Sequence, residues 1–253
     1  MKKILCSVLL LATTGTMAVA TETTETNKKN RETVEFIQRQ VAQNMSIGRA
    51  VKSIVSHYPQ DVEIVVGTAL DLYPDQYKEV IHAAIAAQPA LTEDVVRIAL
   101  EKGITSCTDI VETAINAEPS YVDFVASAAV YSTPEELDDI VRVAVVTEPN
   151  SADAIVRSVA KAHPNKLVDI IKTSMEAVPF VGEYIVDALL AAFPDNADQV
   201  ITTAIQESAS HHENLQRILE TARSAGLTDE QLTEYAFKAG ANAEEVAAIL
   251  NKD

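Results

Sequence analysis

Hydrophobic side chains recur along this chain with the spacing of one face of an α-helix. From residue 59 to residue 208 the sequence divides into ten rows of fifteen residues, with positions numbered 1 to 15 in each row. Positions 4, 7, 8, 11 and 12 are mostly apolar or small, whereas positions 5, 9 and 13 are mostly polar. A strand would alternate with a period of two, so this i, i+3, i+4, i+7, i+8 pattern predicts ten short amphipathic helices.

Three positions define the predicted core of each row. Position 7 is Val or Ile in all ten rows, and position 8 is Val or Ile in nine, with Ala126 as the exception. Position 11 is Ala in seven rows. Because β-branched side chains have few rotamers and Ala lets helix backbones approach closely, we expect neighbouring helices to pack through these positions.

Proline sets the length of each predicted helix. All nine prolines of the chain stand at the first position of a row. Proline is tolerated in a first helical turn, and its ring keeps the preceding residue out of the α region. The row that begins at Ile104 lacks proline but follows Gly103, which can end a helix in another way. Each row is therefore predicted to be one helix of about 12 residues with a turn of two or three.

Helices of this length are only marginally stable alone, so each must bury its apolar stripe against adjacent rows. Short connections favour antiparallel neighbours. The sequence thus predicts an all-α fold, an α-solenoid or superhelix of short antiparallel helices with a helical C-terminal cap. Its architecture resembles the HEAT and armadillo class, without the roughly 40-residue spacing of those families. It is similar to exported bacterial solenoids of 15-residue, proline-phased single-helix repeats. Because odd and even rows share one consensus, a spiral of equivalent helices is an alternative to two layers.

The regions flanking the rows are predicted to cap the solenoid. Residues 31–58 carry a weaker apolar stripe and are assigned to N-terminal capping helices. Residues 209–253 are assigned to a three-helix C-terminal cap, in which Thr228-x-x-Gln231 forms a capping box and Asn242 starts the last helix.

Residues 1–20 have the features of a Sec-type signal peptide: a basic start, a short apolar run and a small-x-small sequence at 18–20. The apolar run is too short to cross a bilayer. We expect cleavage before Thr21, a disordered leader at residues 21–30, and a periplasmic or extracellular location in a bacterium. Cleavage removes one of the two cysteines, so Cys107 has no intramolecular disulfide partner.

The composition is strongly acidic, with 37 Asp and Glu against 20 Lys and Arg and a net charge of −17. Nucleic acid is therefore excluded as a partner, because phosphate binding needs clustered cations. Every row carries a carboxylate at position 5 or 6, so stacked rows would form acidic ridges that attract a cationic partner or Ca²⁺. The alternative is a solvated face partly neutralised by i,i+4 pairs, predicted as Glu93–Arg97, Asp138–Arg142 and Asp153–Arg157.

The row at residues 179–193 departs from the consensus because apolar residues replace polar ones. Its candidate binding residues are Phe180, Val181, Tyr184 and Phe193. A cluster of exposed apolar side chains often marks a partner site. The alternative is a local packing change around Gly182 or a contact with the C-terminal cap.

Motifs for catalysis are missing from the sequence. His211-His212-Glu213 lacks the H-E-x-x-H spacing of a metal site, and there is no G-x-S-x-G, P-loop or G-x-G-x-x-G motif. Cys107 stands at position 4 of its row, where a small buried side chain is expected. We therefore predict no catalytic residue, no metal and no cofactor.

The sequence favours an exported, non-enzymatic helical-repeat protein that serves as a binding or scaffolding surface for a protein partner. No nucleic acid and, after signal cleavage, no integral membrane segment is expected. Two alternatives stay open: a self-assembling structural protein, and a hydrolase whose carboxylates converge across rows.

Overall fold

The computed structural model describes the backbone of residues 16–208 and 212–251, and the side chains of residues 28–208 and 213–251. Over these ranges the chain is all-α, without strands. Two helices, α1 (Thr16–Ala42) and α2 (Ile47–His57), precede the rows. The row helices are α3 (Val62–Leu72), α4 (Tyr77–Ala87), α5 (Thr92–Lys102), α6 (Cys107–Ala117), α7 (Val122–Ser132), α8 (Leu137–Thr147), α9 (Ala152–Ala162), α10 (Leu167–Ala177), α11 (Gly182–Ala192) and α12 (Ala197–Glu207). Three helices follow, α13 (His212–Ser224), α14 (Asp229–Lys238) and α15 (Ala243–Leu250).

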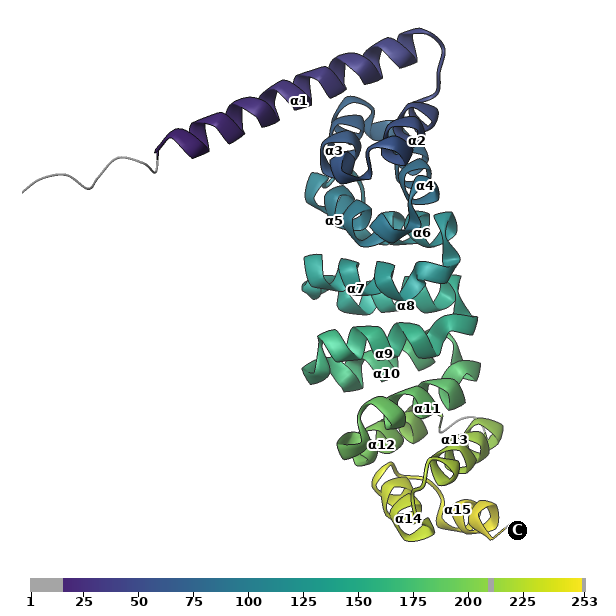
Figure 1. Ribbon diagram of the computed structural model, residues 1–253. Helices are drawn as coiled ribbons and strands as arrows, with labels where there is room; N and C mark the ends of the chain where they lie inside the picture. The colour runs from purple at the N-terminus through teal and green to yellow at the C-terminus, as the bar shows by residue number, and fades with distance from the viewer. Residues whose placement is uncertain (1–15, 209–211, 252–253) are drawn as a thin grey trace, which may run out of the picture.

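The helices stack into an elongated α-solenoid with α1 and α2 at one end and α14 and α15 at the other (Figure 1). From α1 to α14, each helix packs more extensively against the next helix but one than against its immediate neighbour in sequence. Odd-numbered helices therefore form one layer and even-numbered helices form the other. The prediction of an α-solenoid is confirmed, and of the two arrangements left open the chain adopts the two-layered one.

Proline starts a 3₁₀ turn at each corner, and the α-helix begins three residues later. At a representative corner, the 3₁₀ turn is Pro134–Glu136 and α8 starts at Leu137. The preceding Thr133 has φ −135° and ψ 69°, outside the α region as proline requires. Its N–H donates to the Ala129 carbonyl at 2.8 Å, and its own carbonyl accepts from Glu136 at 3.0 Å. One extended residue thus ends one helix and begins the next, and the α-helical part of each row is 11 residues long.

The corner without proline uses glycine and serine instead. Gly103 adopts φ 58° and ψ 32°, the left-handed conformation that glycine reaches without a Cβ penalty, and its N–H donates to the Leu100 carbonyl at 3.0 Å. Ser106 then caps α6, because its hydroxyl accepts a hydrogen bond from the Asp109 N–H at 3.1 Å. The predicted role of Gly103 is confirmed.

A continuous hydrophobic core runs between the layers. Every residue at positions 7, 8 and 11 of the ten rows is at most 1% exposed, including Ser174, whose hydroxyl donates to the Ile170 carbonyl at 2.7 Å. Burial of these apolar side chains contributes on the order of 25 cal/mol per Å² and supplies the stability that isolated helices lack.

Polar contacts join helices of the same layer. Lys102 of α5 pairs with Asp71 of α3, and the hydroxyls of Ser127 and Ser158 lie 3.0 Å apart between α7 and α9. In the even layer, the Thr173 hydroxyl donates to Asp138 at 3.4 Å. These contacts link residues about two rows apart, as the two-layered stacking requires.

One of the three predicted i,i+4 ion pairs is present. Asp153 and Arg157 are 3.8 Å apart. The other two predictions were wrong: Arg97 pairs with Asp94 and Glu101, and Arg142 reaches Glu176 in the next even helix at 3.7 Å. Solvent-exposed pairs differ little in energy, so a long cationic side chain takes whichever carboxylate its rotamer reaches.

The capping regions are helical. Residues 21–30, expected as a disordered leader, have helical backbone as part of α1, and Ile37 of the same helix is fully buried. Thr228 and Gln231 form the predicted capping box, and the Asn242 side chain accepts from the N–H groups of Glu244 and Glu245. Of the predicted signal peptide, residues 1–15 lie outside the described residues. Among the described helices, none combines the length and apolar character that a bilayer crossing requires.

Candidate functional site

The four candidate binding residues of the row at 179–193 do not share one surface. Phe180 and Tyr184 are exposed by 64% and 57%, but Val181 is buried and Phe193 is half-buried against the core. Gly182 explains part of this arrangement, because a Cβ there would lie 3.0 Å from Met175 Cε and 3.6 Å from Ile218 Cδ1. The row thus combines a close packing contact with two exposed aromatic rings.

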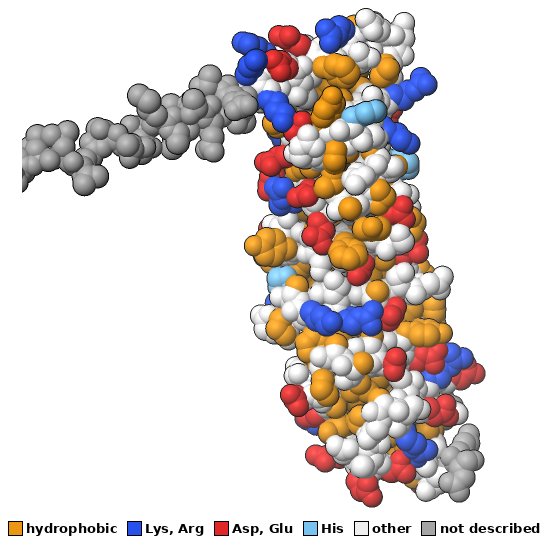
Figure 2. All heavy atoms as spheres, viewed as in Figure 1, with side chains coloured by type: hydrophobic (Ala, Val, Ile, Leu, Met, Phe, Trp, Pro, Cys, Tyr) orange, Lys and Arg blue, Asp and Glu red, His pale blue; other side chains and the backbone are white. Residues whose placement is uncertain are grey.

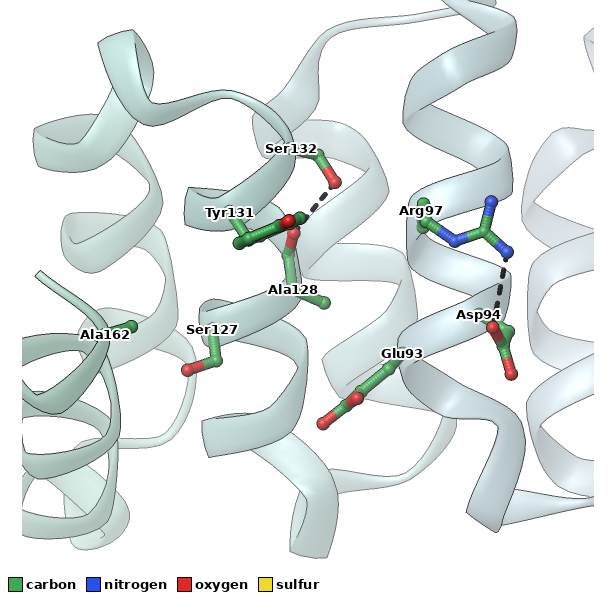
Figure 3. Close-up of a pocket in the computed structure, with 8 residues that line it drawn as sticks. All are labelled: Glu93, Asp94, Arg97, Ser127, Ala128, Tyr131, Ser132 and Ala162. Carbon is green, nitrogen blue, oxygen red and sulfur yellow. Dashed lines mark hydrogen bonds and ion pairs between the residues drawn. The ribbon is translucent and has the colours of Figure 1, made fainter.

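A groove with a different set of side chains lies on the odd layer between α5 and α7 (Figure 3). Its volume is about 360 Å³. Figure 3 shows that α5 contributes charged side chains and α7 contributes small ones together with one aromatic ring. The lining residues are Glu93, Asp94, Arg97, Ser127, Ala128, Tyr131, Ser132 and Ala162.

Small side chains on α7 create the hollow. Ser127 and Ser132 are half-buried, and the Ser132 hydroxyl donates to the Ala128 carbonyl at 2.9 Å, so its hydrogen-bonding capacity is directed along its own helix. Tyr131, at position 13 of its row, is 80% exposed. An aromatic ring this exposed, beside a hollow floored by small residues, is available to a partner side chain.

The charges in the groove are unequally matched. Arg97 donates to Glu101 at 3.1 Å and to Asp94 at 3.3 Å, and chiefly the hydrogen bond to Glu101 raises the pKa of its guanidinium above the ordinary value. Glu93 makes no ion pair or hydrogen bond within the described residues. Its carboxylate extends from α5 toward α7 (Figure 3). The groove therefore holds one carboxylate that is not neutralised by a neighbouring cation.

Sequence reasoning missed this groove, although one signal was present. Tyr131 is the only aromatic residue at position 13 of any row. The contribution of Glu93 could not be found in this way, because it comes from a row 30 residues earlier and meets α7 only through the stacking of the odd layer.

The geometry of the groove fits a cationic side chain. An ammonium or guanidinium group is attracted to the face of a tyrosine ring and to a carboxylate, and the small residues of α7 leave room for an aliphatic stem. Nothing in the groove pairs a nucleophile with a general base. Among the described residues, no three His, Cys, Asp or Glu side chains gather to hold a metal ion.

Cys107, at the start of α6, is buried and lies beside a hydroxyl and several acids. Its side chain is 6% exposed, with Sγ 3.4 Å from Thr133 Oγ1. Burial is the main cause that raises the pKa of this thiol, and the carboxylates of Glu136 and Asp139 raise it further. The predicted burial of Cys107 is confirmed, and its surroundings disfavour the thiolate.

We expect Cys107 to react slowly with thiol reagents in the folded protein. At pH 8 its modification rate should be lower than that of an exposed thiol by at least roughly tenfold, because both burial and the raised pKa reduce the accessible thiolate. Ellman's reagent measures the rate, with Cys107→Ser/Val146→Cys as the control that carries an exposed thiol. Equally fast modification in the two proteins would show that this corner opens readily.

The histidine pair contributes no described site. His212 is the first residue of α13, and His211 lies outside the described residues. The whole chain was also compared with known proteins. No family model matches its sequence, and none of the curated proteins compared with it is similar in sequence.

Proposed function

We propose that this protein is an exported bacterial scaffold without enzymatic activity, whose odd helix layer binds a cationic segment of a partner protein. The groove between α5 and α7 carries this proposal, because it places the unpaired carboxylate of Glu93 beside the exposed ring of Tyr131. Export is supported by the signal-peptide features of residues 1–20.

The electrostatics of the chain favour a cationic partner. Its net charge of −17 attracts basic segments over distances of about a Debye length, roughly 8 Å at physiological ionic strength. Within the groove, a Lys or Arg side chain would gain an ion pair with Glu93 and a cation–π contact with Tyr131. Such a contact is worth roughly 0.5–2 kcal/mol.

The binding test uses short fluorescent peptides that carry Lys or Arg between neutral residues. We expect Tyr131→Ala to weaken their binding by roughly 2- to 30-fold, the range that a cation–π contact accounts for. Glu93→Gln should weaken binding and also reduce its dependence on salt, because one carboxylate no longer attracts the peptide. Fluorescence anisotropy at several salt concentrations measures both effects.

Phe180→Ala is the matched control, since it removes another exposed aromatic ring of the odd layer, on the corner before α11. Loss of binding on Phe180→Ala, with Tyr131→Ala unchanged, would move the site to α11. Equal binding of an acidic peptide of the same length would contradict a site that selects positive charge.

A further inference from the structure

The two ends of the solenoid carry opposite charge. Residues 28–58, in α1, α2 and their connection, contain six Lys and Arg against two Glu, a net charge of +4. Residues 212–251, which form α13 to α15, contain three Lys and Arg against seven Asp and Glu, a net charge of −4. Figure 2 shows Lys and Arg gathered around the first end and Asp and Glu prevailing at the opposite end. This asymmetry is unrelated to the groove between α5 and α7.

The basic end contains a groove with apolar side chains. It lies between α1 and α2, has a volume of about 410 Å³, and includes the rings of Phe36 and Tyr58 together with Ile54. Tyr58 is 56% exposed. Lys29 pairs with Asp61 across this groove, and the Arg39 guanidinium lies 5.8 Å from the centre of the Phe36 ring.

Most of the positive charge at this end is not consumed by ion pairs. Arg31, Arg49 and Lys52 make no ion pair within the described residues, and all three are exposed. The groove is therefore an apolar slot beside cations that remain available to a partner.

The acidic end presents the complementary pattern on one helix face. Leu232 and Ala236 of α14 are fully buried, which leaves Glu230, Glu234 and Phe237 on the opposite side at i, i+4 and i+7. All three are exposed, Phe237 by 51%, and neither carboxylate makes an ion pair within the described residues. This α14 stripe combines an apolar ring with two free negative charges.

We propose that copies of this protein associate head to tail, with the α14 stripe of one copy seated in the α1–α2 groove of the next. Phe237 fills the apolar slot beside Phe36 and Tyr58. Glu230 and Glu234 meet the cations that surround the slot. Because the two contact surfaces are different and lie at opposite ends of an elongated molecule, the contact is heterologous and extends into open chains of copies (Figure 1).

The net negative charge of the protein does not prevent this contact. Six helices stacked about 9 Å apart in a layer place the ends on the order of 50 Å from each other, several times the Debye length of roughly 8 Å. Charges at the contact are therefore felt strongly, while those along the rest of the solenoid are largely screened. At low salt the same screening is weaker, but the opposed end charges attract more strongly as well.

Sedimentation velocity of the purified protein over a range of concentrations tests the proposal. We expect species that grow with concentration at moderate salt and dissociate as salt rises to about 1 M, where the Debye length is roughly 3 Å. Phe237→Ala and Phe36→Glu should each weaken association by roughly tenfold or more, the first by removing the apolar plug and the second by placing a carboxylate in the slot. Val146→Ala is the control, an exposed apolar residue of α8 far from both ends.

Mixing the two end variants distinguishes a head-to-tail contact from any symmetric one. Phe237→Ala keeps an intact groove and Phe36→Glu keeps an intact α14 stripe, so the mixture should form one-to-one dimers while each variant alone is monomeric. Thermal unfolding of each variant checks that it is folded.

Three results would overturn the proposal. The wild-type protein could stay monomeric at all salt concentrations, the mixture could fail to form dimers, or Phe237→Ala could associate as the wild type does. A monomeric protein that binds vesicles of anionic phospholipid would assign the basic end to a membrane surface instead.

Discussion

Replacing Ile140 with Asp is expected to unfold the rows around α8. Ile140 is fully buried at position 7, where no cation or hydrogen-bond donor is available to a carboxylate. Burying an unpaired charge or losing this side chain is among the few changes that cost more than about 4 kcal/mol. We expect the loss of a cooperative transition, or a transition at much lower denaturant concentration, in urea unfolding followed by circular dichroism.

Val146→Asp, in the same helix, provides the matched control. Val146 is 55% exposed, so the new carboxylate stays in water. Its position near the end of α8 costs only about 0.3–1 kcal/mol through the helix dipole. Similar unfolding curves for Ile140→Asp and Val146→Asp would show that the assigned core stripe is wrong.

Deleting one row is expected to be far more damaging than deleting two. Removal of residues 134–148 shifts every later helix into the other layer, whereas removal of 134–163 leaves each later helix in its own layer. The layers differ at position 3 of the row. In odd-layer rows this residue is half-buried or buried, as Val181 is, and in even-layer rows it is polar and mostly exposed, as Lys166 and Asn196 are.

The single deletion would therefore expose Val181 and move Lys166 and Asn196 into less exposed places. Together with mismatched contacts at the junction, this should make the single deletion less stable than the double deletion by at least about 3 kcal/mol. Urea unfolding of the two deletion proteins measures the difference. Equal stability would favour a solenoid in which all rows are interchangeable, since the shorter deletion removes less of the core.

The position 3 difference is readable in the sequence once the layers are known. Odd-layer rows carry Asp61, Leu91, Tyr121, Ser151 and Val181 there, and even-layer rows carry Gln76, Ser106, Glu136, Lys166 and Asn196. The sequence analysis treated all rows as one consensus, because positions 7, 8 and 11 do not distinguish the layers. A repeat of 30 residues was therefore hidden beneath the stronger repeat of 15.

The candidate sites were less predictable than the fold. Apolar content alone suggested that Phe180, Val181, Tyr184 and Phe193 form a cluster, but the corner geometry turns Val181 into the core and leaves Phe180 and Tyr184 exposed. The groove beside Tyr131 needed two rows to meet. The two ends were assigned correctly as helical caps, yet their opposite charges gain meaning only because the helices place them at opposite ends of one elongated molecule.

By itself, the sequence determined where each row helix lies, which face is buried and how the chain turns between helices. Those properties depend on contacts within about four residues and on the fixed φ of proline, so they are written locally. Only the tertiary structure decided which rows touch. Contacts between residues 30 apart depend on how the helices stack, and it is this stacking that joins Glu93 to the groove of Tyr131 and separates the basic end from the acidic one.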